Sequence, residues 1–127
     1  MTSLSPFERA RYVSLATYRR NGAEVCTPVW MAEHDGRYYI FSAGDAGKVK
    51  RINVNPRARI APSDARGKVL GAWCDVEARI VYEPAVIERG YVALRRKYGW
   101  QMRLLDFFSA LSGKINQRAL IELAPIE

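Results

Sequence analysis

The sequence predicts a mainly β fold, an antiparallel β-barrel with helices packed against its outside. Two observations predict this fold. Six short segments rich in β-branched and aromatic residues follow one another closely, and most of them are joined by tight-turn motifs. Closure into a barrel is expected because it removes exposed strand edges. At 127 residues the chain is long enough for one core, so a single domain is expected over residues 1–127.

Turn and cap residues justify the elements of the first half. Proline at the first helical position after a serine favours a helix start, and Asn-Gly favours a two-residue hairpin turn. In chain order we expect a short helix after Ser5-Pro6, strands at 12–18, 24–33 and 37–42, and turns at Asn21-Gly22 and His34-Asp35-Gly36.

In the second half of the chain, proline and glycine residues mark the predicted ends of helices and strands. Apolar residues at helical spacing indicate two helices, each closed by a glycine. In chain order we expect a helix from Gly47-Lys48 to Asn55-Pro56, a strand at 57–61, a polar loop at 63–68, a strand at 69–82 bent near Gly71, helices from Pro84 to Gly99 and at 101–111, and a strand at 115–123.

Charge and cysteine content narrow the possible partners and the compartment. Twenty Lys and Arg against 13 Asp and Glu give a formal charge of +7, which favours anionic partners such as a polyanionic small molecule. No apolar run approaches the length of a membrane span, and the first residues lack the apolar region of a signal peptide. Cys26 and Cys74 are expected to be reduced and buried, as in a cytoplasmic protein.

The segment 37–62 carries most of the functional information. An apolar strand runs into a small, glycine-containing turn, which opens a helix bearing Lys48, Lys50 and Arg51. A helix start offers unpaired N–H groups and a partial positive charge, so this segment predicts a phosphate site. It is not a Walker A loop, because Val49 follows Lys48 where that motif needs Ser or Thr. A solvated basic helix face is the alternative.

Familiar catalytic sets are missing from the sequence. His34 is the single histidine and is expected to be an exposed turn residue, so a His-rich zinc site is excluded. A bound cofactor is therefore expected to carry the chemistry if the protein is an enzyme. The apolar stretch 104–111 is expected to be buried in a dimer or in the core, with a substrate pocket or a membrane contact as alternatives.

Two proline-containing segments interrupt their strands. Proline cannot donate to a sheet ladder, so Thr27-Pro28-Val29-Trp30 and Ala61-Pro62 are expected at an edge or at the rim of a cleft. Trp30 and Trp73 can each stack on a ligand ring or fill the core, and core filling is the expectation for Trp30.

These motifs in this order resemble a known family. Thr-Pro-Val-Trp (27–30), Gly-Lys-Val-Lys-Arg (47–51), Asn-Pro-Arg (55–57), Ala-Pro (61–62) and Gly-Lys-Val-Leu-Gly (67–71) resemble the pyridoxamine 5'-phosphate oxidase-like split barrels. Within them the pattern is similar to flavin/deazaflavin oxidoreductases of the B type, in the subgroup of F420-dependent enzymes. The resemblance extends from about Phe7 to Leu123.

The resemblance implies a homodimer of six-stranded split β-barrels with two cofactor sites at the subunit interface. It assigns the phosphate to the end of the third strand and the following helix start, and the ring system to the interrupted strands. The implied cofactor-binding residues are Ser42, Ala43, Gly47 and Lys48 for the phosphate, Lys50 and Arg51 for the tail, and Thr27, Pro28, Val29, Trp30, Ala61 and Pro62 for the ring, with Trp73 reaching in from the partner subunit.

The chain departs from true pyridoxamine phosphate oxidases, and this departure bears on the cofactor. Their flavin phosphate site uses an Arg-Lys pair before the helix and further basic residues on the second strand. Here Gly47 precedes Lys48, and the positions near Thr27 and Ala32 are uncharged. The deazaflavin F420, with its phosphate-linked oligoglutamate tail, suits the basic chain better than FMN, which is the alternative.

The expected function is therefore hydride transfer between F420 and a small electron-poor acceptor, with no catalytic side chain assigned. An FMN-dependent oxidoreductase and a non-catalytic carrier of a flavin, deazaflavin or tetrapyrrole are the alternatives. A barrel that binds single-stranded nucleic acid is disfavoured, because most aromatic residues occupy core-like positions.

Overall fold

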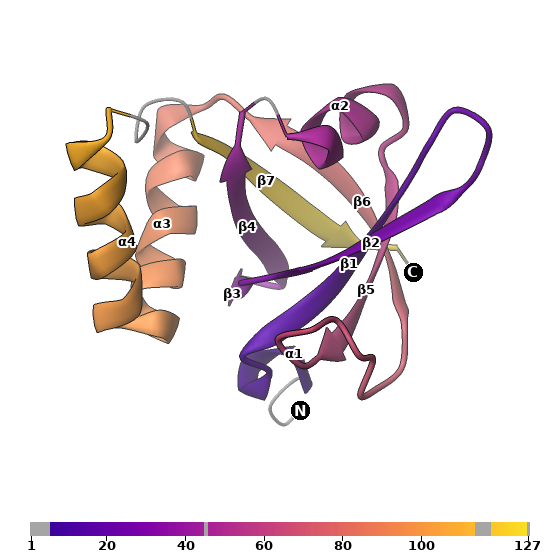
Figure 1. The fold of residues 1–127 in the computed structure, drawn as a ribbon, viewed down its shortest axis with the longest axis horizontal. Helices are drawn as coiled ribbons and strands as arrows, with labels where there is room; N and C mark the ends of the chain where they lie inside the picture. Colours follow the sequence, from indigo (N-terminus) through magenta and orange to yellow (C-terminus); the bar gives the residue numbers. More distant parts are fainter. Residues whose placement is uncertain (1–5, 45, 114–117, 127) are drawn as a thin grey trace.

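The computed structural model describes residues 6–44, 46–113 and 118–126. Its elements are α1 (Pro6–Arg9), β1 (Tyr12–Tyr18), β2 (Glu24–Val29), β3 (Ala32–His34), β4 (Arg37–Ala43), α2 (Gly47–Val54), β5 (Arg57–Ser63), β6 (Cys74–Val81), α3 (Pro84–Tyr98), α4 (Trp100–Leu111) and β7 (Arg118–Pro125). The described strands form one antiparallel seven-stranded sheet in the order β2-β1-β5-β6-β7-β4-β3. The sheet curls into a split barrel, with α3 and α4 to one side and α2 over one end (Figure 1).

The sheet has seven strands rather than the expected six because the second strand is two strands. Residues 24–29 pair with β1, whereas residues 32–34 pair with β4 at the other edge of the sheet. Trp30 and Met31 thus carry the chain from one sheet edge to the other, which explains why the predicted continuous strand 24–33 was wrong. Tertiary contacts hold the crossing, since the Met31 N–H donates to the Tyr98 hydroxyl at 3.0 Å and Lys97 Nζ donates to the Met31 carbonyl at 2.6 Å.

The two tight hairpins form where their turn residues predict them. Gly22 has φ of 88° in the β1–β2 turn. Asp35 and Gly36 have φ of 51° and 81° in the β3–β4 turn, and positive φ at both central residues suits the right-handed twist of a hairpin. Both turns are confirmed in position, but the β1–β2 loop has three residues, 20–22, rather than two, since the Arg19 N–H donates to the Ala23 carbonyl and Asn21 has no positive φ.

Other element boundaries differ from the sequence predictions. The fifth strand continues through Ser63, and Val69 forms only an isolated bridge to Ser63, so the predicted long strand 69–82 begins at Cys74 instead. Lys68 donates its backbone N–H to Asp64, and the polar loop before β6 is therefore closed on itself. The predicted last strand 115–123 is Arg118–Pro125 in the described chain; residues 114–117 and Ser5, part of the predicted first cap, lie outside it.

One apolar cluster fills the barrel. Leu15, Ile40, Ile60 and Ile121 are fully buried there, and each contributes about 1.5–3 kcal/mol of burial free energy. Helix α2 covers one end of the barrel, where its buried residues Val49 and Ile52 join the apolar cluster. The helix start with its lysines is therefore fixed at the barrel rim.

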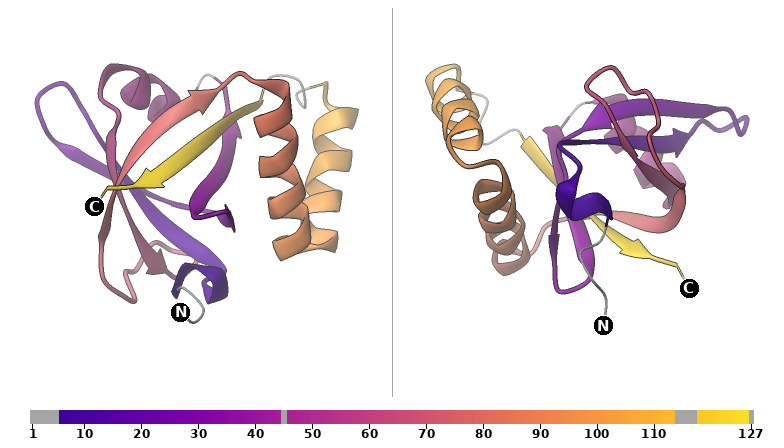
Figure 2. Two further views of the ribbon diagram at one scale, coloured as in Figure 1. Left: turned by 180° about the vertical axis from the view of Figure 1, so that it is seen from behind. Right: turned by 90° about the horizontal axis from the view of Figure 1, so that it is seen from below.

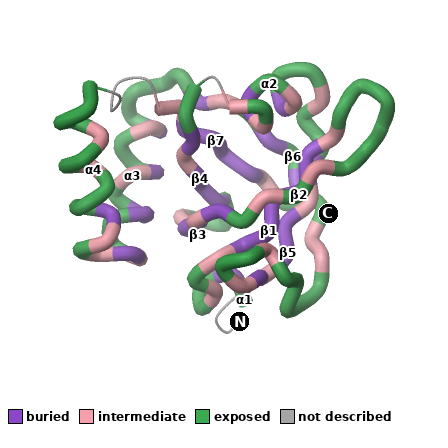
Figure 3. Tube along the Cα trace, viewed as in Figure 1, coloured by how far each residue is buried: buried purple, intermediate pink, exposed green. Residues whose placement is uncertain are grey.

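A second cluster lies outside the barrel, between the sheet and α3. Period-2 alternation sends Leu120 to this side of β7, where it packs with Tyr39, Leu94 and Tyr98. Gly90 of α3 permits the close approach, because a Cβ there would lie 2.5 Å from Leu120 Cδ2. Figures 2 and 3 show α3 between the sheet and the outermost helix α4, whose outer side is largely exposed.

For the apolar stretch 104–111 the structure excludes burial in the core and does not test burial in a dimer. Only Met102 of α4 is buried, and the apolar side chains of 104–111 do not pack in the core of the described chain. No helix in the described ranges is long and apolar enough to cross a bilayer.

Candidate cofactor site

The start of α2 forms the centre of the candidate site. Ala46 precedes the helix and makes no side-chain cap, and the described first turn holds no acidic residue. The backbone N–H groups of Val49 and Lys50 donate to Ala46 O at 3.1 and 3.3 Å. Among the described residues no acceptor outside the helix is found for the earlier amides, Gly47 and Lys48, as is usual for the first turn of a helix.

The guanidinium of Arg51 folds back over this helix start. A Cβ on Gly47 would lie 2.8 Å from Arg51 Nη1, so the glycine makes room for the guanidinium one turn further along the helix. Arg51 Nε also donates to Thr17 Oγ1 on β1 at 2.7 Å, which fixes the side chain in place. Sequence reasoning placed Arg51 only on the tail of a ligand, whereas the structure brings it next to the predicted phosphate position.

Lys48 carries a half-buried positive charge at the same place. Burial lowers the pKa of its ammonium, and the charge of Arg51 lowers the pKa further. Among the described residues no carboxylate lies within ion-pair distance of Lys48. A buried charge without a counter-charge is costly, so a bound anion would relieve both effects.

A basic groove continues from this point between α2 and the β1–β2 hairpin. Its volume is about 370 Å³, and it is lined by Tyr18, Arg19, Arg20, Lys50, Arg51 and Val54. Four of these six residues are cationic, and none is acidic. The groove can therefore hold an extended anionic group. Sequence reasoning missed Arg19 and Arg20, which it treated as a turn; the basic doublet was visible, but nothing local placed it opposite α2.

Part of the predicted ring surface is assembled on β2, β1 and β5. Ser14 of β1 pairs with Pro28 of β2 on one side and with Ala61 of β5 on the other, so these three side chains share one face. Thr27 and Val29 alternate to the opposite face, and Val29 joins the barrel core. Ser14 and Ala61 are buried there in the described chain, and Pro28 is the exposed member of the three.

An ion pair and a tryptophan border this face. Arg59, two residues from Ala61 on β5, places its guanidinium 4.4 Å from the centre of the Trp73 ring. Arg59 Nη2 also contacts Glu24 Oε2 at 2.8 Å, and the Tyr18 hydroxyl donates to the same oxygen at 3.1 Å. Burial opposes the effect, but these hydrogen bonds lower the pKa of Glu24. Trp73 therefore lies at the edge of the ring surface of its own chain.

The two parts of the site lie on different faces of β1. Ser14 beside the ring surface and Thr17 beside Arg51 are three residues apart, roughly 10 Å along the strand, and period-2 alternation directs their side chains to opposite faces of the sheet. Ser42 is buried, and its hydroxyl donates to the carbonyl of Ala43 where β4 ends before α2. Asp45 lies outside the described residues.

Two predicted ring residues lie differently from Pro28 and Ala61. Trp30 is half-buried and stacks on Tyr98, with the ring centroids 4.6 Å apart and 9° between the planes. It thus packs against α3 at the strand crossing, as core filling requires. Pro62 is half-buried and pairs with Val13, on the alternate face from Ala61. Their contact with a cofactor stays a prediction.

A separate cavity of about 330 Å³ lies between α1, β3 and α3, away from these residues. Lys97 lines it, but its ammonium is held by the carbonyls of Phe7 and Met31. Burial lowers the pKa of Lys97 to about 8. His34 also lines it, half-exposed at the end of β3. The Lys97 hydrogen bonds tie α3 to the strand crossing, so we regard this lysine as structural.

The cysteines do not contribute to the site. Cys26 is exposed, so the expectation of burial was wrong for it, and Cys74 is half-buried. Burial raises the pKa of the thiol in both residues, as does a neighbouring carboxylate, Glu24 for Cys26 and Asp75 for Cys74. Within the described ranges no three His, Cys, Asp or Glu side chains gather as metal ligands.

Comparisons with known proteins place this geometry in a family. Among solved structures, the heme storage protein HutZ from Vibrio cholerae matches with a TM-score of 0.71 and 17% identity over 95% of this chain and 86% of that one. A conserved hypothetical protein from Mycobacterium tuberculosis matches with a TM-score of 0.71 and 20% identity over 98% and 82%. A structure described as an F420 reductase matches with a TM-score of 0.61 and 18% identity over 95% and 90%.

At such identities these likenesses show the fold alone. A search of curated proteins finds no match. The family model described as pyridoxamine 5'-phosphate oxidase matches residues 4–127, which is nearly the whole chain. The chain therefore belongs to the pyridoxamine 5'-phosphate oxidase family of split barrels.

Proposed function

We propose that this protein is an oxidoreductase that binds the deazaflavin F420 and transfers a hydride between it and a small electron-poor organic acceptor. The observation that carries the proposal is the half-buried charge of Lys48 at the start of α2, next to Arg51 and without a carboxylate partner among the described residues. Two cations and free helix N–H groups at one point are suited to a phosphate, because charge-assisted hydrogen bonds to its oxygens are strong.

The basic groove favours F420 over FMN. FMN ends at its phosphate, whereas F420 continues into a tail of several carboxylates. The groove that contains Arg19, Arg20 and Lys50 begins at Arg51, and none of its described lining residues is a carboxylate. A cofactor that uses the groove gains further charge-assisted contacts, each about 1.5–3 kcal/mol when desolvated and less when exposed.

The residues have separable roles in this proposal. Lys48 and Arg51 hold the phosphate, and the groove holds the tail. The exposed Pro28, next to the buried Ser14 and Ala61, supports the ring, which would supply or accept the hydride when bound. A second copy of the chain, as a homodimer, covers the ring and excludes water from it. No side chain is assigned as a proton donor.

A carrier of a flavin, deazaflavin or tetrapyrrole is the second candidate. The likeness to a heme storage protein favours it. However, the only histidine, His34, lies at the β3–β4 turn and not on the ring surface, so this chain offers no imidazole there to a haem iron. Acceptor turnover separates the two functions, since a carrier binds its cofactor without oxidising or reducing anything.

Parallel titrations test the cofactor assignment. F420, FMN, FAD and haem are titrated into wild-type protein and into an Arg19→Ala/Arg20→Ala variant, with Arg66→Ala in the polar loop as one control. A second control is Arg103→Ala on the outer helix α4, because the loop of Arg66 packs on Pro28. We expect F420 to bind more tightly than FMN, and we expect the groove variant to lose that difference while the Arg103→Ala control keeps it. Equal affinities for F420 and FMN that the groove variant leaves unchanged would contradict the proposal.

A further inference from the structure

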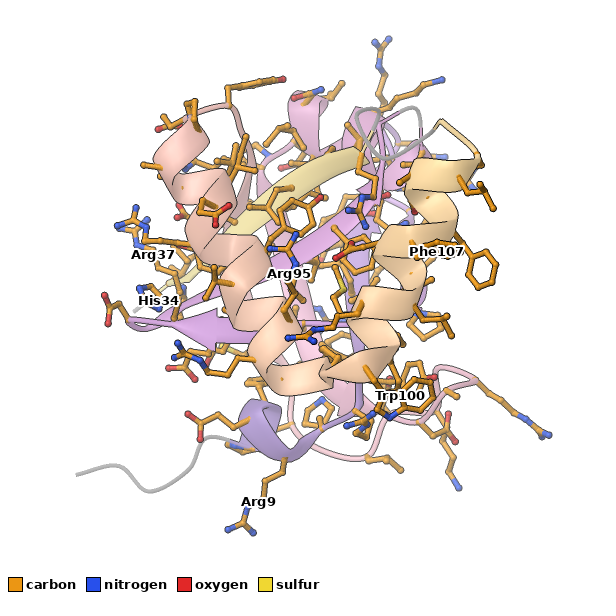
Figure 4. All side chains as sticks on the ribbon, turned by 90° about the vertical axis from the view of Figure 1, so that its left-hand side faces the viewer. Arg9, His34, Arg37, Arg95, Trp100 and Phe107 are labelled. Atoms are coloured by element: carbon orange, nitrogen blue, oxygen red, sulfur yellow. The ribbon has the colours of Figure 1, made fainter. Side chains whose placement is uncertain are left out.

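The cavity between α1, β3 and α3 has the size and the lining of a small-molecule site. Its volume of about 330 Å³ lies in the usual range of ligand pockets, roughly 300–1,000 Å³. The apolar part of its lining is Ala32, Val92 and Ala93, and the two alanines are buried. In Figure 4, His34, which also lines the cavity, lies to the left of α3 and away from α4. A ligand bound here would therefore occupy a site apart from the candidate cofactor site.

Six charged side chains line this cavity, and they carry equal numbers of both signs. The acids and the bases are Glu8, Glu33 and Glu88, and Arg89, Arg96 and Lys97. Within the part of the chain that the structure describes, none of these acids forms an ion pair with any of these bases. A lone cation would meet three bases in the cavity, and a lone anion would meet three acids. The balanced lining therefore favours a ligand that carries both charges.

Glu33 provides the acidic end of the site. Its Oε1 atom is buried and accepts no hydrogen bond within the described ranges. Burial raises the pKa of this carboxyl, the charge of Glu8 raises it further, and the charge of Lys97 acts in the opposite direction. The Lys97 ammonium donates to the carbonyls of Phe7 and Met31 and not to this carboxylate. A partly buried carboxylate without a partner is costly, so an ammonium group bound beside it would be stabilised.

Arg96 provides the basic end of the site. It precedes Lys97, whose charge reaches Glu33, whereas Arg89 lies two helical turns away, roughly 10 Å along α3. Arg96 has no ion-pair partner among the described residues. A guanidinium binds a carboxylate through two parallel N–H donors, which fixes the orientation of the bound group. The apolar Val92 lies one turn from Arg96 on the same cavity.

We propose that this cavity binds a small zwitterion of the α-amino acid type with an aliphatic side chain. The ammonium group of the ligand pairs with Glu33, and its carboxylate pairs with Arg96. The aliphatic part packs against Ala32 and Val92. Binding here does not depend on the proposed cofactor, because the phosphate position and the basic groove lie on α2 and the β1–β2 hairpin.

Calorimetric titration of the full chain with three matched compounds tests this proposal. L-leucine carries both charges, 3-methylbutylamine lacks only its carboxylate, and 4-methylpentanoate lacks only its ammonium group. We expect L-leucine to bind with a dissociation constant of about 1 mM or lower. Each single-charge compound should bind about 10-fold more weakly, because it loses one charge-assisted contact. L-leucine should also raise the midpoint of thermal unfolding, because a ligand of the folded state stabilises that state by mass action.

Two matched pairs of variants locate the binding. Glu33→Gln and Arg96→Gln each remove one charge from the cavity, and Glu77→Gln on β6 and Arg103→Gln on α4 remove the same charges elsewhere. Each cavity variant should weaken the binding of L-leucine about 10-fold, while both controls bind it like wild type. Thermal unfolding without ligand verifies that the variants fold. Arg96 is exposed, so its variant keeps the proposal testable even where Glu33→Gln lowers stability.

Three results would overturn the proposal. The first is that L-leucine at about 10 mM causes neither binding heat nor a shift of the thermal midpoint. The second is that either single-charge compound binds as tightly as L-leucine, which would show that one charge suffices. The third is that a folded Glu33→Gln or Arg96→Gln variant binds L-leucine as tightly as wild type, which would place the ligand elsewhere.

Discussion

Lys48→Met is the most decisive perturbation of the candidate site. It removes the ammonium group and keeps an unbranched side chain of similar length. In the proposed complex this ammonium makes a charge-assisted contact with the phosphate, worth about 1.5–3 kcal/mol. The variant should therefore bind F420 and FMN about 10- to 150-fold more weakly.

The same substitution should have a different effect on folding. Without cofactor, burial and Arg51 lower the pKa of Lys48, so the charged form is disfavoured in the folded chain. Removing that charge should leave the free energy of unfolding unchanged or slightly increased. If Lys48 had only a structural role, its substitution would lower both the stability of the protein and its affinity for the cofactor.

The pH dependence provides a further check. The unliganded chain should gain stability as pH rises toward the ordinary lysine value of 10.5, because the folded state releases the Lys48 proton first. Phosphate binding needs the protonated form, so cofactor affinity should fall over the same range. Lys48→Met should show neither trend from this residue.

Fluorescence titration and urea unfolding measure the two effects side by side. Arg103→Met is the matched control, since Arg103 is exposed on α4, which lies at the other end of the molecule from α2 (Figure 1). Unchanged cofactor affinity in Lys48→Met would refute the assigned phosphate position. An equal loss of affinity in the control would show that total charge, rather than this position, governs binding.

The remaining predictions concern the scaffold. Burial lowers the pKa of Lys97 to about 8 and raises the pKa of Tyr98 to about 12, so the free energy of unfolding should rise between pH 8 and 10 and fall above pH 10. In urea titrations at different pH values, Lys97→Met should abolish the rise and Tyr98→Phe should abolish the fall. A pH dependence identical to that of wild type in these variants would contradict the prediction. Gly90→Ala should lower the free energy of unfolding by about 1–3 kcal/mol in thermal unfolding, because its Cβ would clash with Leu120. In the Leu120→Ala background the same substitution should cause little further loss of stability. If the losses of the two single variants simply add in the double variant, the two residues do not clash. Glu122→Gln should cost about 2 kcal/mol, because this buried carboxylate accepts hydrogen bonds from two arginines and a tyrosine; a neutral result in urea unfolding would show that these bonds add no net stability.

Local features of the fold were predictable because few residues determine them. The Asn21-Gly22 turn and the start of α2 after Gly47 depend on backbone preferences within a few positions, and both occur where expected. The crossing at Trp30 and Met31 was not predictable. Its residues have ordinary strand character, and the partners that redirect them come from α3, far along the sequence.

The sequence alone determined the family, the mainly β fold and a basic helix start suited to an anion, because each of these follows from motifs, periodicity and charge along the chain. Only the tertiary structure decided that Arg19 faces α2 across a groove, that Arg51 returns to the helix start, and that the apolar side of α4 lies outside. The physical reason is that the spacing of apolar residues predicts which face of a helix is apolar, but not which other part of the protein covers that face. Likewise, a charged side chain acquires its neighbours only when distant strands and helices pack together.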